Sequence, residues 1–481
     1  MAHVTGPSRD QLALFPTTLN EAVSADHPVR VIDAFVDGVD LAEMGFSKVV
    51  AEEMGRPPYA PGDLLKLYVY GYMNRVRSSR ALEREAKRNV EVIWLIHGLT
   101  PAFKTIADFR KDHAQAIVEV CRQFIRFCRE LCLVGGELIA IDGTKIEAVA
   151  SRKQVITPKS VEKKIAALDR KIAAHLAAMD EADREERPDG VAAMDSSSVA
   201  KALQELREKR ATAQQRGEHL KRQGLSQLVL SEPEAKLMRT ARHGHQVAYN
   251  AQTVVDAEHK LIVAFDLTNQ GNDQRQLHPM AVQGKQALEV EQVIAVADAG
   301  YSNGEHGQRC EADGITAIVP RAETVNPEGK QYFSRDRFSY DAATDSWQCP
   351  AGETLTCREV SHTEQKKKYW SVACEGCALK SQCTAAAKRM IVRHFCEDAR
   401  DAMHQRAVRD PTWLERRREI AEHPYGTIKW LMGYPGFLVQ GLRKAKAELA
   451  LTVLSYNLKR AINILGVAAL LQALQPLPSC R

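Results

Sequence analysis

The sequence predicts a multidomain α/β protein, in which an all-helical N-terminal domain is followed by a mixed β-sheet core. Apolar residues recur every three or four positions from about residue 26 to 112, as in DLLKLYVYGYMNRV (63–76), which is the period of amphipathic helices. Apolar runs rich in β-branched residues begin only at residue 138, and they indicate strands. A chain of 481 residues, of which 44% are hydrophobic, is long enough for about two to four domains with buried cores.

Charge and hydropathy limit the classes of function. Lys and Arg total 66 against 61 Asp and Glu, a formal net charge of +5, so a nucleic-acid surface would have to come from local clustering. The chain has no run of eighteen or more apolar residues, and MAHVTGPSRDQLALF at its start lacks the sections of a signal peptide. We therefore expect a soluble, cytosolic protein with no membrane partner.

The N-terminal domain, residues 1–132, is predicted to be helical. ALEREAKRNVEVIWLI (81–96) has helical periodicity, and Thr105 and Asp108 have the spacing of a capping pair that would begin another helix. Basic residues are dense beside Ser78 and Ser79. These are Arg75, Arg77, Arg80, Arg84, Lys87 and Arg88, followed by Lys104, Arg110 and Lys111. A solvated helix face explains any single one of them, whereas their density indicates a phosphate-binding surface.

The first part of the sheet domain, residues 133–157, contains the strand LIAIDGTKIE (138–147) and is then interrupted. From 158 to 222 the chain is polar and rich in Ala, Lys, Glu and Arg, with apolar residues at helical spacing in two segments. These are Val161, Ile165, Leu168, Ile172, Leu176 and Met179, then Val199, Leu203 and Leu206. Thr157 before Pro158 is a good N-cap and first-turn pair. We predict an inserted antiparallel helical hairpin.

The sheet pattern resumes in residues 223–325. YNAQTVVD (249–256) and HKLIVAFDLT (259–268) alternate around a tight link, which is typical of a β-hairpin. EQVIAVADAGY (291–301) and GITAIVP (314–320) are two further strands, and a helix is expected before the first of them. Residues 398–481 are predicted to be helical and to complete this core.

Two acidic residues lie at strand positions. Asp142 interrupts an apolar strand, where an ionised carboxylate without a partner is costly, and Asp298 ends the strand of 291–301. Adjacent parallel strands lie about 4.8 Å apart, so the two carboxylates could approach each other. Their repulsion would call for a divalent cation, as in two-metal phosphoryl transfer.

A third carboxylate is predicted in RREIAEHPYGTIKWL (417–431). Arg418, Glu422 and Lys429 are separated by four and seven residues and therefore share one helix face. Glu422 could ligate metal while the two bases contact DNA phosphates. The alternative is that these three residues only form salt bridges on the surface of an ordinary helix, which has the same spacing.

The other acidic residues are weaker candidates for the metal site. Asp256 is interpreted as a turn residue, and Asp273 as a helix cap or a residue of a loop beside the site. Glu419 and Glu448 lie on other helix faces, and Glu147 should face the opposite side of the sheet from Asp142.

A cysteine-rich insertion is predicted at 326–397. A CPxG knuckle and a C-x2-C-x5-C run could hold Zn²⁺ with four thiolates, which we assign to Cys349, Cys374, Cys377 and Cys383, with Cys357 as the spare. The alternative is a set of reduced cysteines without a ligand. The helical cysteines Cys121, Cys128 and Cys132 are interpreted as core residues.

These motifs resemble a known family. IDGTK (141–145), ADAGY (297–301) and the triplet Arg418, Glu422 and Lys429 are similar to the three signatures of DDE-type bacterial insertion-sequence transposases. GYMNRVRSSRALEREAKRNVEVIWL and KTIADFRKDH resemble the N-terminal domain of one branch, the eleven-eighty-two family. The resemblance implies a ribonuclease-H-like core in which Asp142, Asp298 and Glu422 ligate the catalytic metal, and that family also carries a cysteine-rich insertion before its glutamate.

The function implied is that of a bacterial DNA transposase. Two Mg²⁺ or Mn²⁺ ions would support strand cleavage and transfer, with the element's terminal repeats and the target as double-stranded DNA partners. Basic residues of the core and of the N-terminal domain are expected to contact DNA phosphates. In the core these are Arg418, Lys429 and Lys145, and in the N-terminal domain Arg75, Arg77 and Arg80. Synapsis implies a homodimer at least, and the cytoplasmic protein would lie on the nucleoid when bound. The alternatives are a non-catalytic DNA-binding derivative and a structure-specific nuclease on the same core.

Overall fold

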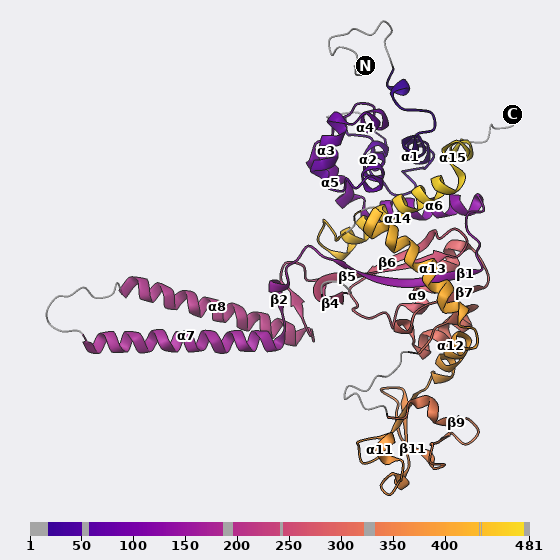
Figure 1. Cartoon of the computed structure of the whole chain (residues 1–481). Helices are drawn as coiled ribbons and strands as arrows, with labels where there is room; N and C mark the ends of the chain where they lie inside the picture. Colours follow the sequence, from indigo (N-terminus) through magenta and orange to yellow (C-terminus); the bar gives the residue numbers. More distant parts are fainter. Residues whose placement is uncertain are drawn as a thin grey trace, which may run out of the picture.

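The computed structural model in Figure 1 describes residues 18–50, 57–185, 196–240, 244–321, 332–431, 433 and 435–475. A helical N-terminal region lies at one end, a mixed sheet with flanking helices forms the centre, and a small β-rich module lies at the other end (Figure 1). Two long helices project sideways from the central part. The predicted combination of a helical N-terminal region and a mixed α/β centre is confirmed.

The N-terminal region consists of helices, some of which begin at a capping side chain. Ser78 accepts a hydrogen bond from the Ala81 amide at the start of α3, and Asn89 caps α4 in the same way. The capping pair predicted at Thr105 and Asp108 is wrong, because α5 begins earlier, at Phe103, and has no side-chain cap. The elements are η1 (Leu19–Ala22), α1 (Pro28–Asp37), α2 (Pro61–Met73), α3 (Ser79–Arg88), α4 (Val90–Leu95), α5 (Phe103–Asp112) and α6 (Ala114–Glu130).

The central sheet combines antiparallel and parallel pairings. β5 pairs antiparallel with β4, β6 and β1, while β1, β7 and β8 run parallel to one another. The register places Asp142 opposite Thr253 and Ala140 opposite Val296. The strands are β1 (Leu138–Glu147), β4 (Lys236–Thr240), β5 (Gly244–Asp256), β6 (Ile262–Thr268), β7 (Val293–Val296) and β8 (Ile315–Ile318).

Helices cover both faces of this sheet. Alternate residues of β1 enter two different cores, with Leu138 and Ala140 in one and Ile139 and Ile141 in the other. The first core contains α6 and α14, and the second contains α9, α10 and part of α12. Asp142 therefore belongs to the face of Ala140. The helices are α9 (Leu277–Leu288), α10 (Gly304–Ala312), α12 (Glu397–Arg409), α13 (Thr412–Gly426), α14 (Leu442–Leu465) and α15 (Val467–Leu474).

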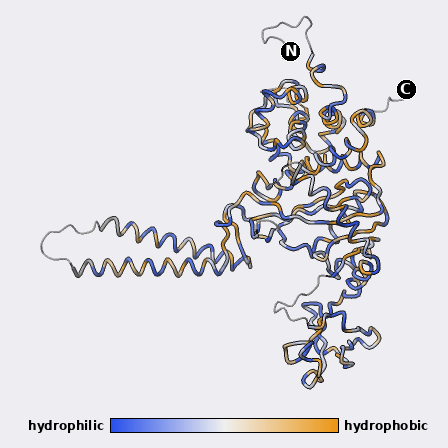
Figure 2. Tube along the Cα trace, in the orientation of Figure 1, coloured by the Kyte–Doolittle hydropathy of each residue, from blue (hydrophilic) through white to orange (hydrophobic). Residues whose placement is uncertain are grey.

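The two projecting helices form the predicted hairpin. α7 (Pro158–Glu185) and α8 (Ser196–Arg222) pack along each other, and the side chain of Thr157 caps α7 by accepting from the Ser160 amide. A short ladder of β2 (Val155–Ile156) with β3 (Leu228–Val229) closes the base. Of the predicted stripe, Val161, Leu168 and Leu203 are buried. Polar and apolar residues alternate along this hairpin, whereas the central sheet is largely apolar (Figure 2). The predicted link around 186–195 and the side chain of Val199 lie outside the described residues.

The β-rich module contains an antiparallel sheet in the order β13-β12-β11-β10-β9. Its small core is formed by Phe338, Trp347, Leu355, Tyr369 and Ile391. The elements are η4 (Arg335–Arg337), β9 (Ser339–Asp341), β10 (Ser346–Gln348), β11 (Thr354–Ser361), β12 (Lys366–Trp370), η5 (Val372–Cys374), α11 (Lys380–Cys383) and β13 (Ile391–His394).

A buried carboxylate joins this module to the central part. Glu397, at the start of α12, accepts hydrogen bonds from Arg321 at 2.6 Å and from Arg335 at 3.1 Å. Within the described ranges, no helix has both the length and the apolar character needed to span a membrane.

Candidate active site

Two carboxylates meet where β1 and β7 leave the buried part of the sheet. Asp142 lies two residues beyond Ala140, the last β1 residue paired with β7, and Asp298 lies two residues beyond the end of β7. Asp298 caps the short helix η3 (Ala299–Tyr301) by accepting from the Gly300 amide at 2.8 Å. The parallel pairing of the two strands therefore carries both acids to the same edge of the sheet.

One arginine of α13 contacts both acids. Arg417 Nη2 lies 2.6 Å from Asp142 Oδ1 and 3.6 Å from Asp298 Oδ2. The three side chains are unequally exposed, since Arg417 and Asp142 are largely buried whereas Asp298 is 48% exposed. The guanidinium thus compensates part of the negative charge that the two strands bring together.

Burial raises the pKa of Asp142 to about 6. The Arg417 guanidinium and the Gly143 amide, which donates at 2.9 Å, favour the charged form and oppose this rise, whereas the charges of Asp298 and Asp273 add to it. Arg417 and the Gly143 amide therefore do not fully offset the cost of burying the charged Asp142 carboxylate.

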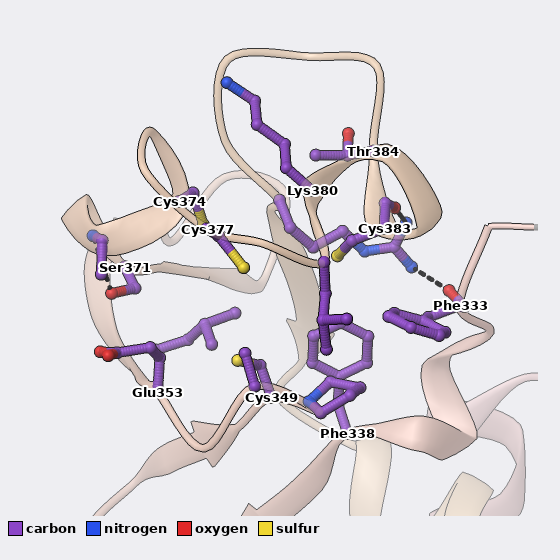
Figure 3. Close-up of a pocket in the computed structure, with 16 residues that line it drawn as sticks. Phe333, Phe338, Cys349, Glu353, Ser371, Cys374, Cys377, Lys380, Cys383 and Thr384 are labelled. Atoms are coloured by element: carbon purple, nitrogen blue, oxygen red, sulfur yellow. Dashed lines mark hydrogen bonds between the residues drawn. The ribbon is translucent and has the colours of Figure 1, made fainter.

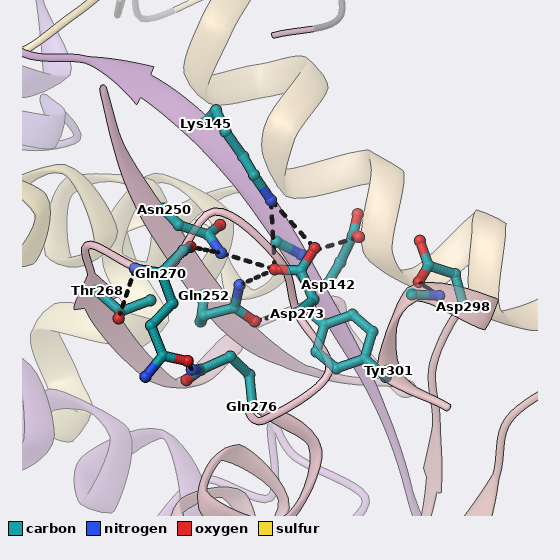
Figure 4. A network of polar contacts seen from close by, with 12 residues as sticks. Asp142, Lys145, Asn250, Gln252, Thr268, Gln270, Asp273, Gln276, Asp298 and Tyr301 are labelled. Atoms are coloured by element: carbon teal, nitrogen blue, oxygen red, sulfur yellow. Dashed lines mark hydrogen bonds and ion pairs between the residues drawn. The ribbon is translucent and has the colours of Figure 1, made fainter. Parts of the chain in front are cut away.

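A third acid, Asp273, lies beside this pair and is held by donors (Figure 4). Its carboxylate accepts from Asn250 and Gln252 at 2.7 Å each and from Lys145 at 3.1 Å. Tyr301 extends the network by donating its hydroxyl to Gln252 at 2.5 Å. Of the two interpretations of Asp273, the loop beside the site is the one the structure shows, because α9 has no side-chain cap.

Glycine at position 143 leaves room for this close packing. A Cβ atom there would lie 2.4 Å from Gln252 Nε2 and 2.9 Å from Asp273 Oδ1. Gly143 therefore lets the network of Asp273 approach the backbone beside Asp142.

The end of α13 is irregular, and it positions two more side chains. Pro424 lies inside the helix, which is followed by a π-helical turn, η6 (Thr427–Leu431). Tyr425 donates its hydroxyl to the Asp142 carbonyl at 3.2 Å and also contacts the Thr253 hydroxyl at 2.9 Å. Lys429 donates to the Thr144 hydroxyl at 2.6 Å. The helix is thereby fixed against β1 and β5.

Glu422 and Arg418 are exposed on α13. Within the described part of the chain, no three His, Cys, Asp or Glu side chains come close enough together to hold a metal ion, so Glu422 does not join Asp142 and Asp298 here. The inward arginine is Arg417, one position before the residue that sequence spacing selected. Residues 416–418 are all arginine, so the sequence alone does not indicate which of the three faces the sheet.

The basic residues predicted in the N-terminal region have different environments. Arg77 is buried and pairs at 2.6 Å with Glu448 of α14, which is fully buried, and it also donates to the Gly436 carbonyl at 2.5 Å. Arg80 lies over the ring of Phe103 at 4.9 Å from its centroid. Arg77 thus forms a buried ion pair inside the protein, and its contact with a DNA phosphate stays a prediction.

The four cysteines assigned to zinc surround one small apolar cavity (Figure 3). Burial raises the pKa of the Cys383 thiol, Arg389 opposes this rise, and the neighbouring Cys374, Cys349 and Cys377 add to it. The spare, Cys357, lies on β11 and is not among the residues that line the cavity. The thiols converge, although the spacing between them is not that of a bound metal.

Two family models match the chain. Residues 17–112 match a family described as Transposase domain (DUF772), and residues 348–462 match one described as Transposase DDE domain. The second match runs from the cysteine-containing module to α14 and includes the helix with Arg417, Glu422 and Lys429.

Both matched families are transposase families, and together the matches support an insertion-sequence transposase of the DDE type. They do not distinguish the branch within that class, which stays a prediction. No curated protein and no solved structure matches the sequence.

Proposed function

We propose that this transposase cleaves DNA at the ends of its element and joins them to target DNA, with Asp142 and Asp298 as ligands of divalent metal ions. The observation that carries the proposal is the meeting of two carboxylates, from neighbouring parallel strands, around a single cation. Carboxylates this close need a positive charge between them, and Arg417 supplies one in the protein alone.

The donor set suits Mg²⁺ or Mn²⁺. Both ligands are carboxylate oxygens, and Mg²⁺ is commonly bound by one or two carboxylates together with substrate phosphates. The raised pKa of Asp142 indicates a carboxylate that a dication would stabilise further. When bound, two such ions would activate the attacking oxygen and stabilise the leaving oxygen of the phosphodiester.

The surrounding side chains have roles that follow from their positions. Lys145 neutralises Asp273, so that a further acid can lie near the metal ligands without adding its full charge. Lys429, on η6 beside Thr144, and Arg418, on α13, are proposed to neutralise phosphate charge. Glu422, on the same helix, remains our candidate for the third metal ligand, since α13 packs against β1, which carries Asp142.

The core is proposed to be ribonuclease-H-like. Three antiparallel strands, β6, β5 and β1, are followed by the parallel strands β7 and β8, with acids on β1 and after β7. In this division the core comprises 133–157, 223–325 and 398–481, with 158–222 and 326–397 as insertions. Residues 1–132 form the DNA-binding domain, for which Arg75 and Arg80 are the candidate phosphate contacts, and a homodimer holds the two ends.

Zinc is proposed as a structural ion of the cysteine-containing module. Cys349, Cys374, Cys377 and Cys383 line one cavity, and a module with so small a core gains stability from a metal. Purified protein should contain about one zinc per chain by elemental analysis. Replacing Cys374 and Cys377 together by Ser should remove it, while Cys357→Ser should retain it. Equal zinc contents in both variants would refute this assignment.

The proposed reaction is tested with labelled element ends, a target plasmid and Mg²⁺. Asp142→Asn and Asp298→Asn should each reduce cleavage at least about 1,000-fold, because the metal loses a ligand, while end binding changes less than about twofold. Glu422→Gln should behave in the same way, and Glu419→Gln is the matched control that keeps activity, because the Glu419 carboxylate is paired with Lys260 at 3.0 Å.

The products distinguish the alternatives. Joined ends identify a transposase, whereas cleavage without joining identifies a nuclease. End binding without cleavage by the wild-type protein would identify a non-catalytic derivative. Full cleavage by Asp142→Asn would contradict the proposed site, and full cleavage by Glu422→Gln would remove only the third ligand.

A further inference from the structure

We propose that Arg417 is a movable cation that neutralises Asp142 and Asp298 in the metal-free protein and binds a phosphate oxygen of the DNA once metal is bound. This inference rests on the proposed function and adds to it a catalytic residue outside the predicted set of Arg418, Glu422 and Lys429. The ligand it assigns to Arg417 is a phosphodiester anion.

The position of Arg417 is the first observation. One of its nitrogens, Nη2, lies within 4 Å of both carboxylates, at 2.6 Å from Asp142 and 3.6 Å from Asp298. A dication held by these two carboxylates would compete with the guanidinium for them. A guanidinium and a dication would repel each other there, so metal binding requires the side chain to withdraw.

The hydrogen bonding of Arg417 is the second observation. Its Nε is buried and has no hydrogen-bond partner among the described residues, although a buried N–H donor of a charged group is normally satisfied. Arg321 and Arg335, which pair with Glu397, also have a buried Nε without a partner among the described residues, so Arg417 is distinguished by its position between two acids, one of which is partly exposed. Phosphate oxygens match the planar fork of a guanidinium, and binding through Nε and one terminal nitrogen would satisfy the unpaired donor.

The surroundings allow this movement. The backbone of α13 is fixed against the sheet by Tyr425 and Lys429, so the helix can stay in place while the arginine side chain rotates. Asp298, the more weakly contacted acid, is 48% exposed and leaves an open side toward solvent. A DNA phosphate that approaches the two acids would therefore meet the guanidinium on that side.

Binding of Mn²⁺ without DNA, measured by electron paramagnetic resonance, tests the first half of the inference. Arg417→Gln should bind Mn²⁺ at least about fivefold more tightly than wild type, because no cation competes for the carboxylates. Arg417→Lys keeps the charge and should stay within about twofold of wild type, as should Arg416→Gln, the exposed neighbour that lies over Trp413. Unchanged or weaker binding by Arg417→Gln would overturn the proposal.

Chemical modification of the wild-type protein gives a second test that does not depend on a variant folding. Phenylglyoxal modifies accessible arginines, and peptide mass spectrometry locates the sites. Mg²⁺ should increase modification of Arg417 at least about twofold, since the side chain leaves the buried acids, and a short duplex carrying the element end should reverse the increase. Arg416 should not change. A rate for Arg417 that is insensitive to Mg²⁺ would overturn the inference.

The Mn²⁺ measurements distinguish a failure of the proposed metal site from a failure of the proposed role of Arg417. If Mn²⁺ binds neither wild type nor Arg417→Gln, the proposed metal site itself is wrong. If Mn²⁺ binds both equally, the metal site stands and the role of Arg417 is refuted.

Discussion

Asp142 shows how a functional residue departs from its local sequence pattern. It follows four buried apolar residues of β1, and its carboxylate has a raised pKa because burial outweighs the help of Arg417 and the Gly143 amide. A carboxylate retained at such a cost in free energy is typical of a site whose partner is a ligand.

The pKa of Asp142 leads to a prediction for metal binding. Because this pKa is near 6 and a metal binds the deprotonated carboxylate, protons should compete with Mn²⁺ as the pH falls. In the absence of DNA, the Mn²⁺ affinity of wild type should level off above about pH 7 and weaken about tenfold per pH unit below about pH 6. An affinity that stays constant down to about pH 5 would show that Asp142 is not a ligand.

At the residue scale, the sequence indicates which strand residues lie near each other but not which helix residue faces them. The two aspartates could be paired from sequence because parallel strands end at a common edge and each acid ends an apolar run. The inward arginine could not, because α13 carries charges around most of its circumference. Spacing therefore selected Arg418, which is exposed, and missed Arg417.

At the scale of elements, α13 and α14 connect the site to the rest of the protein. α14 packs against α2 and α6 on one side and β6 on the other, so it forms the contact between the N-terminal helices and the sheet. Glu448 on this helix is fully buried and compensated by Arg77. The basic cluster that was predicted to bind DNA thus contains one residue whose role is structural.

Arg77→Met should therefore destabilise the fold. The substitution leaves Glu448 buried without its cation, which typically costs about 3–5 kcal/mol, and chemical denaturation monitors the loss. Arg80→Met, which removes a contact with the ring of Phe103, should cost less than about 1 kcal/mol. A loss of end binding by Arg77→Met without any loss of stability would show that this residue contacts DNA instead.

At the scale of the whole molecule, the hairpin of α7 and α8 stands apart from the other layers (Figure 1). Its helices pack mainly against each other, and the β2–β3 ladder holds its two ends together. The core of the protein thus continues across the insertion without depending on it.

Replacing residues 158–222 by a short glycine- and serine-rich turn should leave the rest of the fold intact. Ile156 and Leu228 are paired in the ladder, so Thr157, an inserted turn of about four residues and residues 223–227 can connect the strands. The melting temperature should change by less than about 4 °C in calorimetry. An unfolded or aggregated product would show that the hairpin supports the core. With a folded product, the affinity for end DNA and the oligomeric state show whether the hairpin contacts DNA or a second subunit.

The overall architecture was more predictable than its contacts. Helical periodicity, the alternating strands and the cap at Thr157 predicted where elements lie, since these signals are local in sequence. The pairing of Arg77 with Glu448, and that of Asp142 with Arg417, join residues hundreds of positions apart, and a single sequence carries no signal for them. The place of Glu422 near the metal remains a prediction.

The central claim is that Asp142 and Asp298 hold a divalent metal, and iron-mediated backbone cleavage tests it most directly. Fe²⁺ substituted for Mg²⁺ produces hydroxyl radicals on addition of ascorbate and peroxide, and these cut the chain beside the bound ion. We predict cuts near residues 142 and 298 that excess Mg²⁺ suppresses, with a third in α13 if Glu422 completes the site. Asp142→Asn should abolish them all. An absence of cuts at both strands, or cuts that Mg²⁺ does not suppress, would contradict the account.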